Sequence, residues 1–332
     1  MTKRRHLFAV SALFAAVAAF GMPSVASAQT VIKLGWTTTD GATDPYAIGA
    51  RAFKAAVEKD TNGSVQVQLY PNRQIGDEKQ VLEGIRFGTV DAGIVTNAVV
   101  AQMEPAFQIN DLPFLYTSEA QAQKVLDGKV GADLAALLAK KNIVVLGYME
   151  GGFRHMINNK KPVSAPADVQ GVKYRVMQNP LFIDMFNSLG GAAVPMAWGE
   201  TFTAVQQGTI DGLELPVAVI DNSKMYEVTK FLSLTNHTYS MIALLISKKA
   251  LDKLTPDQRK AVIEAGKSAT VLQRIEAAKN EKILLAGLAQ KGMTINQVTN
   301  MVPFRTAVQP IYVKTRAAVG DAMMNQAMDA VK

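Results

Sequence analysis

The sequence predicts an α/β protein built from parallel strands and crossover helices. Three observations support this prediction. Residues 31–95 alternate short apolar runs with amphipathic segments, at the spacing of strand, helix, strand, helix and strand. About 300 residues follow an N-terminal leader, a length typical of two lobes or of one large α/β domain. Residues 257–290 contain no helix breaker other than two glycines, and such a helix would be about 50 Å long, more than one small lobe across.

The first 28 residues have the features of a signal peptide. Residues 3–5 are basic, residues 7–20 are apolar, and residues 26–28 form the small-residue pattern that signal peptidase recognises. The apolar run is shorter than the roughly 20 residues that a membrane-spanning helix needs, which disfavours a membrane anchor. We therefore expect cleavage after Ala28, a mature N-terminus at Gln29 and a soluble periplasmic protein.

Strands are expected at 31–36, 65–69 and 90–95. The first and third are short apolar runs typical of buried strands, and the second alternates apolar and polar residues. Two helices should separate them, and the second should end at Gly88. Their inner faces would carry Phe53, Ala56 and Val57 in the first helix, and Val81, Leu82 and Ile85 in the second.

The same alternation continues along the chain. Ser118 and Gln121 have the spacing of a capping box that opens a helix. Buried strands are expected at 143–146 and 241–246, with strand, helix and strand between 172 and 194. Thr255, followed by a proline and then by a glutamine at the third helical position, predicts the start of the long helix.

The chain is expected to leave the first lobe near Gly151-Gly152 and to return to it with strand 241–246. This division assigns residues 29–151 and 240–280 to lobe I. It assigns residues 152–239 and 281–332 to lobe II. The long helix would then run along both lobes as a strut.

Charge and composition exclude several classes of protein. The chain has 35 Lys and Arg against 28 Asp and Glu residues; the leader takes three basic residues, which leaves 32 against 28, a net charge of +4. This charge favours anionic ligands but is far from a nucleic-acid-binding footprint, so no nucleic-acid partner is expected. The absence of cysteine excludes thiolate catalysis and cysteine metal sites.

No motif for an enzymatic reaction is found in the sequence. Nucleophile elbows, Walker loops, dinucleotide-binding turns and zinc-protease helices are all missing. The histidines are His6, His155 and His237, and none has metal-ligand spacing. We expect no enzyme, no catalytic residue, no cofactor and no metal. An exported enzyme remains a rival hypothesis, which incubation with candidate acids and a search for product would test.

A series of motifs makes the mature chain resemble the substrate-binding subunits of tripartite ATP-independent periplasmic (TRAP) transporters, of the dicarboxylate- and sialic-acid-binding type. Each motif alone is weak, but their order and spacing are specific. The motifs are Tyr70-Pro71, Gln74-Ile75-Gly76, Gly88-Thr89-Val90-Asp91, Asp111-Leu112-Pro113-Phe114-Leu115, Gly171-Val172-Lys173-Tyr174-Arg175-Val176, Pro195-Met196-Ala197-Trp198-Gly199-Glu200, Gln206-Gln207-Gly208-Thr209-Ile210-Asp211-Gly212 and Leu234-Thr235-Asn236-His237.

The resemblance implies a two-lobe periplasmic binding protein fold, with a ligand cleft, hinge strands and a long helix spanning both lobes. It also implies capture of a small organic acid by cleft closure: a dicarboxylate, a sugar acid or an oxo acid. The partners would be this acid and the membrane subunits of a TRAP transporter, and we expect a monomer. A periplasmic sensor for a signalling receptor is the alternative, because its sequence would look the same.

Two arginines match ligand-binding positions of the family. Arg175 matches the carboxylate-clamping arginine, and a guanidinium suits this role because it stays charged and donates two parallel hydrogen bonds. Arg154 matches a second arginine that often approaches the ligand. Without the motifs, an arginine placed like Arg175 is more often part of a surface ion pair, and Arg154 could equally form a structural salt bridge.

The remaining ligand-binding candidates follow from the same alignment and from their places after strands, where open α/β sheets bind ligands. Leu215 stands where many relatives, including sialic-acid binders, have a ligand-contacting Asn, so an amide that could bond hydroxyl groups or the carboxylate of a ligand is missing at this position. His237 is expected behind the ligand contacts, near the cleft and hinge. The full set of further candidates is Gln178, Trp198, Leu215, Thr96, Asn97, Trp36, Thr37 and His237.

Overall fold

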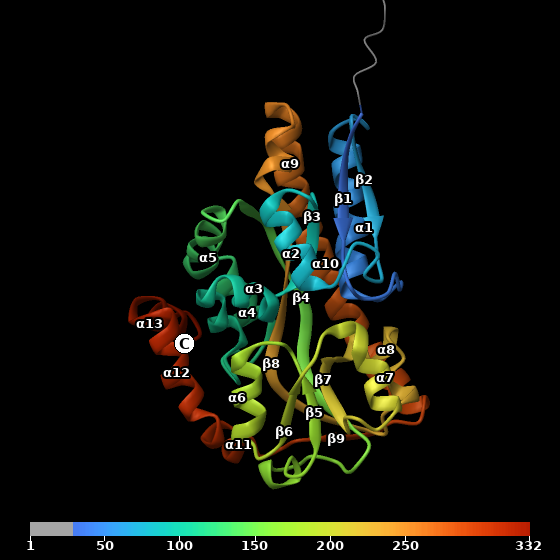
Figure 1. Ribbon diagram of the computed structural model, residues 1–332, viewed down its shortest axis with the longest axis vertical. Coiled ribbons are helices and arrows are strands. Elements are labelled where there is room, and N and C mark those ends of the chain that lie inside the picture. Colours follow the sequence, from blue (N-terminus) through green and yellow to red (C-terminus); the bar gives the residue numbers. More distant parts are fainter. Residues whose placement is uncertain (1–28) are drawn as a thin grey trace, which may run out of the picture.

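The computed structural model describes residues 29–332, and its strands form one nine-stranded sheet (Figure 1). The strand order is β2-β1-β3-β8-β4-β7-β5-β6, and β9 pairs with β8 outside this path. The strands are β1 (Thr30–Gly35), β2 (Val65–Tyr70), β3 (Ala92–Thr96), β4 (Ile143–Asn158), β5 (Lys173–Val176), β6 (Ala192–Pro195), β7 (Gly212–Pro216), β8 (Phe231–Ser247) and β9 (Thr294–Gln297).

Helices cover the sheet and connect its strands. They are α1 (Pro45–Asp60), α2 (Glu78–Phe87), α3 (Asn97–Met103), α4 (Glu119–Leu126), α5 (Lys129–Ala139), α6 (Pro180–Ser188), α7 (Thr201–Gln206), α8 (Val217–Asn222), α9 (Lys248–Asp252), α10 (Pro256–Gln290), α11 (Val302–Ala307), α12 (Gln309–Val319) and α13 (Asp321–Ala330). The 3-10 helix η1 (Pro105–Asp111) follows α3. In the part of the chain that the structure describes, no helix is both long and apolar enough to span a bilayer.

The first half of the sheet has the predicted parallel arrangement. Strand β1 pairs in parallel with both β2 and β3, and α1 and α2 provide the crossovers. Helix α1 begins after Asp44, whose side chain accepts hydrogen bonds from the backbone N–H groups of Tyr46 and Ala47 at 3.0 and 3.1 Å. Phe53 on the inner face of α1 is fully buried, and its burial contributes about 1.5–3 kcal/mol to stability.

Strands β4 and β8 are longer than the sequence predicts, because each continues from one half of the sheet into the other. They pair antiparallel over most of their length and carry the β1–β3 half at one end and the β5–β7 half at the other (Figure 1). The chain passes Gly151-Gly152 without leaving β4, and the register shifts between Glu150 and Gly152. Gly152 has φ 96°, a conformation that favours glycine.

Helix α10 has the predicted start and length. It runs for 35 residues, and its N-cap Thr255 accepts from the backbone N–H of Gln258 at 3.2 Å. The helix packs on α1 and β4 in one half and on α8 in the other, so it spans both (Figure 1). At Ser118 only part of the predicted capping box forms, because Gln121 accepts from the backbone of Thr117 instead of that of Ser118.

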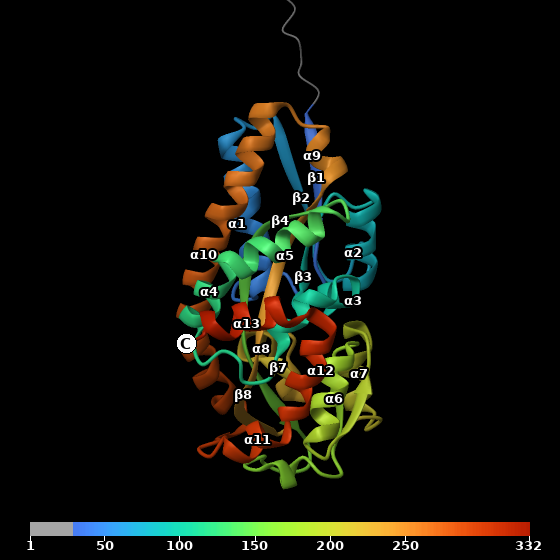
Figure 2. The ribbon, with the colours of Figure 1, turned by 90° about the vertical axis from the view of Figure 1, so that its left-hand side faces the viewer.

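The C-terminal helices cover the face of the sheet opposite α10. Figure 2 shows α12 and α13 across the face that also carries α4 and α5. Helix α12 packs on both η1 and α6, and α13 packs on α4 and α5, so this segment contacts both halves. The division into two lobes at particular residues remains a prediction.

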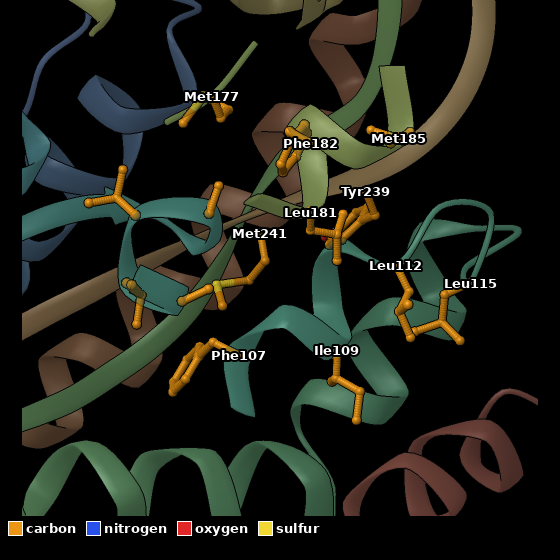
Figure 3. Packing of buried hydrophobic residues seen from close by; sticks show 14 of the residues in the cluster. Phe107, Ile109, Leu112, Leu115, Met177, Leu181, Phe182, Met185, Tyr239 and Met241 are labelled. Carbon is orange, nitrogen blue, oxygen red and sulfur yellow. The ribbon is translucent and has the colours of Figure 1, made fainter. Parts of the chain in front are cut away.

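Apolar side chains from both halves meet on this face (Figure 3). Phe107 comes from η1 and Phe182 from α6, while Tyr239 and Met241 come from β8. The Tyr239 ring packs edge-on against Phe153, with centroids 5.5 Å apart. This core holds η1 and α6 against the long strands that join the two halves.

Candidate ligand-binding site

A cavity lies where the carboxyl ends of the parallel strands from both halves meet. Thr37 follows β1 and Thr96 ends β3, while Met177 follows β5 and Leu215 lies near the end of β7. The space between the lining side chains is about 670 Å³, counting the opening to solvent. Open α/β sheets bind ligands at this edge.

The cavity wall comes from three parts of the fold. The β1–β3 half contributes Thr37, Thr38, Tyr46, Asp77, Glu78, Lys79, Thr96 and Val99. The β5–β7 half contributes Arg175, Met177, Gln178, Met196, Ala197, Trp198, Leu215, Pro216 and Val219, and the two long strands contribute Gly151, Arg154 and Ser240. A ligand bound here would contact both halves.

Arg175 is a buried cation without an acidic partner among residues 29–332. Arg175 belongs to β5, near the carboxyl end of the strand, and it is only 2% exposed. Its Nε and Nη2 atoms donate to the carbonyl oxygen of Met196 at 3.0 and 2.7 Å. Burial lowers the pKa of Arg175 to about 10, so the group remains charged at neutral pH. A buried charge is stable only when it is paired, and an anionic ligand would provide the pairing.

Arg154 has a protein partner already. Its Nε and Nη2 atoms donate to the two carboxylate oxygens of Glu214, the latter at 2.8 Å, and Nη2 also reaches the Glu214 carbonyl oxygen at 2.7 Å. Its Nη1 donates to Ser240 Oγ at 3.2 Å. Burial opposes ionisation of Glu214, but Arg154 and a bond from His237 lower its pKa to about 2. The positive charge of Arg154 is therefore neutralised by a permanent carboxylate.

His237 lies behind this ion pair and does not line the cavity. Its Nε2 is 3.3 Å from Glu214 Oε2, and its Nδ1 is 2.8 Å from Thr235 Oγ1. The ring is fully buried, and burial lowers its pKa. His237 thus orients Glu214, and its place behind the ligand contacts stays a prediction.

The structure places seven of the ten sequence candidates on the cavity wall. These are Arg175, Arg154, Trp198, Leu215, Gln178, Thr96 and Thr37. The remaining three candidates, His237, Trp36 and Asn97, do not line the cavity. Trp36 is fully buried in the core, and its Nε1 donates to the carbonyl oxygen of Thr39 at 3.3 Å. Asn97 donates to the carbonyl oxygen of Phe107 at 2.9 Å and accepts from Asn110 at 3.1 Å.

Two acidic residues at the start of α2 line the cavity but were not among the candidates. Glu78 accepts from the backbone N–H and the hydroxyl of Thr96 at 2.9 and 2.6 Å. Burial raises the pKa of Glu78, and the bonds from Thr96 oppose that shift. The Oδ1 atom of Asp77 is buried and has no hydrogen-bond partner among the described residues. The signal was present in the sequence, since both follow directly on the quoted Gln74-Ile75-Gly76 motif.

Comparison with known proteins identifies the family. Bacterial extracellular solute-binding protein family 7 matches residues 37–318. The chain belongs to this family. The 2,3-diketo-L-gulonate-binding periplasmic protein of Escherichia coli is 34% identical over 319 residues, which are 96% of this chain and 92% of that protein. A solute-binding protein of Verminephrobacter eiseniae is 35% identical over 92% of this chain and 91% of its own length.

Solved structures of TRAP solute-binding proteins have the same two-lobe fold. A TRAP protein from Polaromonas with bound D-erythronate is 35% identical, with a TM-score of 0.87 over 90% of this chain and 98% of that one. A sugar acid binding protein from Advenella mimigardefordensis with galactonate is 31% identical, with a TM-score of 0.88 over 91% and 97%. The resemblance drawn from the motifs is confirmed: this is a TRAP solute-binding protein.

Proposed function

We propose that the family 7 protein captures its organic acid in the cavity between the two halves, with Arg175 binding the carboxylate. The observation that supports this most is the buried guanidinium of Arg175, which donates to a neutral carbonyl oxygen and has no acidic partner among the described residues. Guanidinium presents paired donors that match the two oxygens of a carboxylate. Arg154 lines the same cavity but is committed to Glu214.

Closure of the cleft would couple binding to delivery. The wall comes from both halves of the sheet, so a ligand that contacts both favours the closed state over the open one. To keep the cleft shut, the ligand must favour the closed state by several kcal/mol. The closed, loaded protein would then be the form that the membrane subunits of the transporter receive, and we expect it to act as a monomer.

The ligand is inferred to be a small organic acid. Named relatives bind 2,3-diketo-L-gulonate, D-erythronate and galactonate, and another structure of the family holds succinate. These are sugar acids, an oxo acid and a dicarboxylate, the three classes expected from the sequence. The alternative of a signalling sensor has no support among these relatives, and a neighbouring set of transporter genes would separate the two roles.

The protein is inferred to be exported to the periplasm. The signal peptide and its cleavage site after Ala28 lie outside the described residues, and the family consists of extracellular solute-binding proteins. We expect a mature protein that starts at Gln29 in the periplasmic fraction. Mass spectrometry of the intact purified protein tests this, and an uncleaved N-terminus in a membrane pellet would contradict it.

Substitution of Arg175 tests the site. A thermal-shift screen of organic acids first identifies a ligand, since a ligand at 100 times its Kd should add about 2.7 kcal/mol of stability. Arg175→Ala should then weaken binding by about 2–5 kcal/mol in calorimetry, and Arg175→Lys should also bind poorly because one ammonium lacks the paired geometry. The control is Arg86→Ala, which removes a partly exposed arginine of α2 that does not line the cavity. Unchanged affinity in both Arg175 variants would remove Arg175 from the site.

A further inference from the structure

The basic residues on the cavity wall differ in whether their positive charge is free to pair with a ligand. Arg154 and Glu214 neutralise each other in a two-bond pair, so Arg175 is the buried cation that remains for a ligand among residues 29–332. Lys79 also lines the cavity, but it is exposed to solvent, where water and salt screen its charge. The cavity therefore offers one well-shielded positive charge.

The opposite wall carries two carboxyl groups. Asp77 and Glu78 line the cavity from the N-terminus of α2, and both are among the charged groups that act on Arg175. The Oδ1 atom of Asp77 is buried without a partner, and Thr37 adds a hydroxyl beside this wall. Such a surface can accept hydrogen bonds from hydroxyl groups of a ligand, but it repels a second carboxylate.

We propose that the site selects hydroxylated monocarboxylates over dicarboxylates, and that Asp77 and Glu78 are the residues that exclude the second carboxylate. This inference rests on the proposed function, in which Arg175 binds the first carboxylate. The hydroxyl groups of the acid would face Asp77 and Glu78. The apolar wall formed by Leu215, Val219 and Trp198 would cover the carbon chain.

Two matched pairs of acids test the inference. D-Erythronate and meso-tartrate differ in one terminal group, as do galactonate and galactarate: the first member has a hydroxymethyl group where the second has a carboxylate. Calorimetry at neutral pH should give a Kd for the monocarboxylate that is lower than that for its partner by about tenfold or more. Equal or tighter binding of the dicarboxylate in a pair would overturn the inference and leave the proposed function intact.

Variants show whether the two acids cause the preference. Glu78→Gln and Asp77→Asn each remove a negative charge at nearly constant shape, and each should reduce the preference several-fold, mainly by improving dicarboxylate binding. Glu83→Gln is the charge-matched control, because Glu83 lies on the same helix, pairs with Arg86 and does not line the cavity. If one of the two cavity variants does not fold, the other still gives the result. An unchanged preference in the folded variants overturns the assignment.

Failure of the inference can be separated from failure of the proposed function. No binding of any of the four acids would contradict the inference, because it names their class. The same protein is then screened against other organic acids with Arg175→Ala alongside. Arg175-dependent binding in that screen preserves the proposed function, and its absence contradicts both.

Discussion

Arg154 donates to both carboxylate oxygens of Glu214, and this buried ion pair joins β4 to β7 at the base of the cavity. His237 of β8 contacts the same carboxylate, so three neighbouring strands of the sheet meet at one acidic group. The Arg154 guanidinium also lies over the Phe182 ring, with its carbon 5.7 Å from the centroid. The pair thus has a structural role in addition to its place on the cavity wall.

Glu214→Gln should strongly destabilise the fold. The substitution removes the charge that compensates Arg154 in a fully buried position, and loss of one partner of a buried ion pair costs about 3–5 kcal/mol. Denaturant unfolding of the ligand-free protein measures the change. Glu83→Gln, a partly exposed control, should change the free energy of unfolding by less than about 1 kcal/mol. Equal stability of the two variants would mean that the pair contributes little.

Leu215→Asn should alter the ranking of ligands. Leu215 is 3% exposed, and it both lines the cavity and packs in a core cluster of the second half. It should penalise a ligand hydroxyl that points at it, since a buried unpaired group costs about 1–3 kcal/mol. An amide at this position should weaken binding of the native acid and help an analogue with a hydroxyl there. Calorimetry of both acids and the melting temperature decide between the two roles: lower stability with an unchanged ranking would make Leu215 a core residue.

The stability of the protein should depend on pH through a cluster of acids between β4, α4 and α10. Burial raises the pKa of Glu281 to about 7, and the nearby Glu119 adds to this shift. Burial raises the pKa of Glu150 to about 7 as well. The folded protein then holds protons that the unfolded chain has released, so these groups lower the free energy of unfolding as pH rises from 4.5 to about 7.

Glu281→Gln removes one of these titrations. The variant should be more stable than the wild-type protein at pH 8, by on the order of 1 kcal/mol, and nearly equal to it at pH 5. Urea unfolding at the two pH values measures the difference. Glu276→Gln is the control on the same helix, where the side chain is partly exposed and pairs with Lys279. A pH-independent effect of Glu281→Gln would contradict a raised pKa at this position.

The sequence predicts the local elements well because their signals are local. The cap at Thr255 and the lack of breakers are sufficient to predict a helix that runs from Pro256 to Gln290. The full lengths of β4 and β8 are not predictable in this way. Their central residues, around Gly151 and Ser240, are polar or small and gain their strand conformation from each other across the sheet.

The candidate site likewise combines residues that the sequence predicts with contacts that it does not predict. Arg175 and Arg154 were identified through motifs, but the sequence does not reveal that Glu214, sixty positions after Arg154, neutralises one of them. The segment after β1 gives another example, because the sequence does not reveal which of two neighbouring loop residues faces the cavity. Thr37 lines the cavity, and Trp36 beside it is fully buried in the core.

Hydrogen bonding between a residue of one half and a residue of the other gives a test of closure. Thr43 precedes α1 in one half and Asn222 ends α8 in the other. Asn222 Nδ2 donates to Thr43 Oγ1 at 3.0 Å, and Thr43 Oγ1 donates to Asn222 Oδ1 at 3.3 Å. The two segments are in close contact, because a Cβ atom on Gly41 would lie 2.0 Å from Asn222 Oδ1. Arg73 makes a similar approach to Gly199 between the halves. If the halves separate when the ligand leaves, the bonds between Thr43 and Asn222 exist only in the closed state.

Thr43→Val removes the hydroxyl at nearly constant shape and should therefore weaken ligand binding by about 1–3 kcal/mol, the net value of two hydrogen bonds. The change should occur mainly in the dissociation rate, because the bonds form after the ligand has entered. Stopped-flow release and calorimetry measure the two quantities, and the melting temperature of the ligand-free protein should stay the same. Thr306→Val on α11, where the side chain is exposed and bonds within its own helix, is the matched control. A loss of ligand-free stability equal to the loss of affinity would show that the bonds also hold the empty protein together, and the two halves would then not separate at this point.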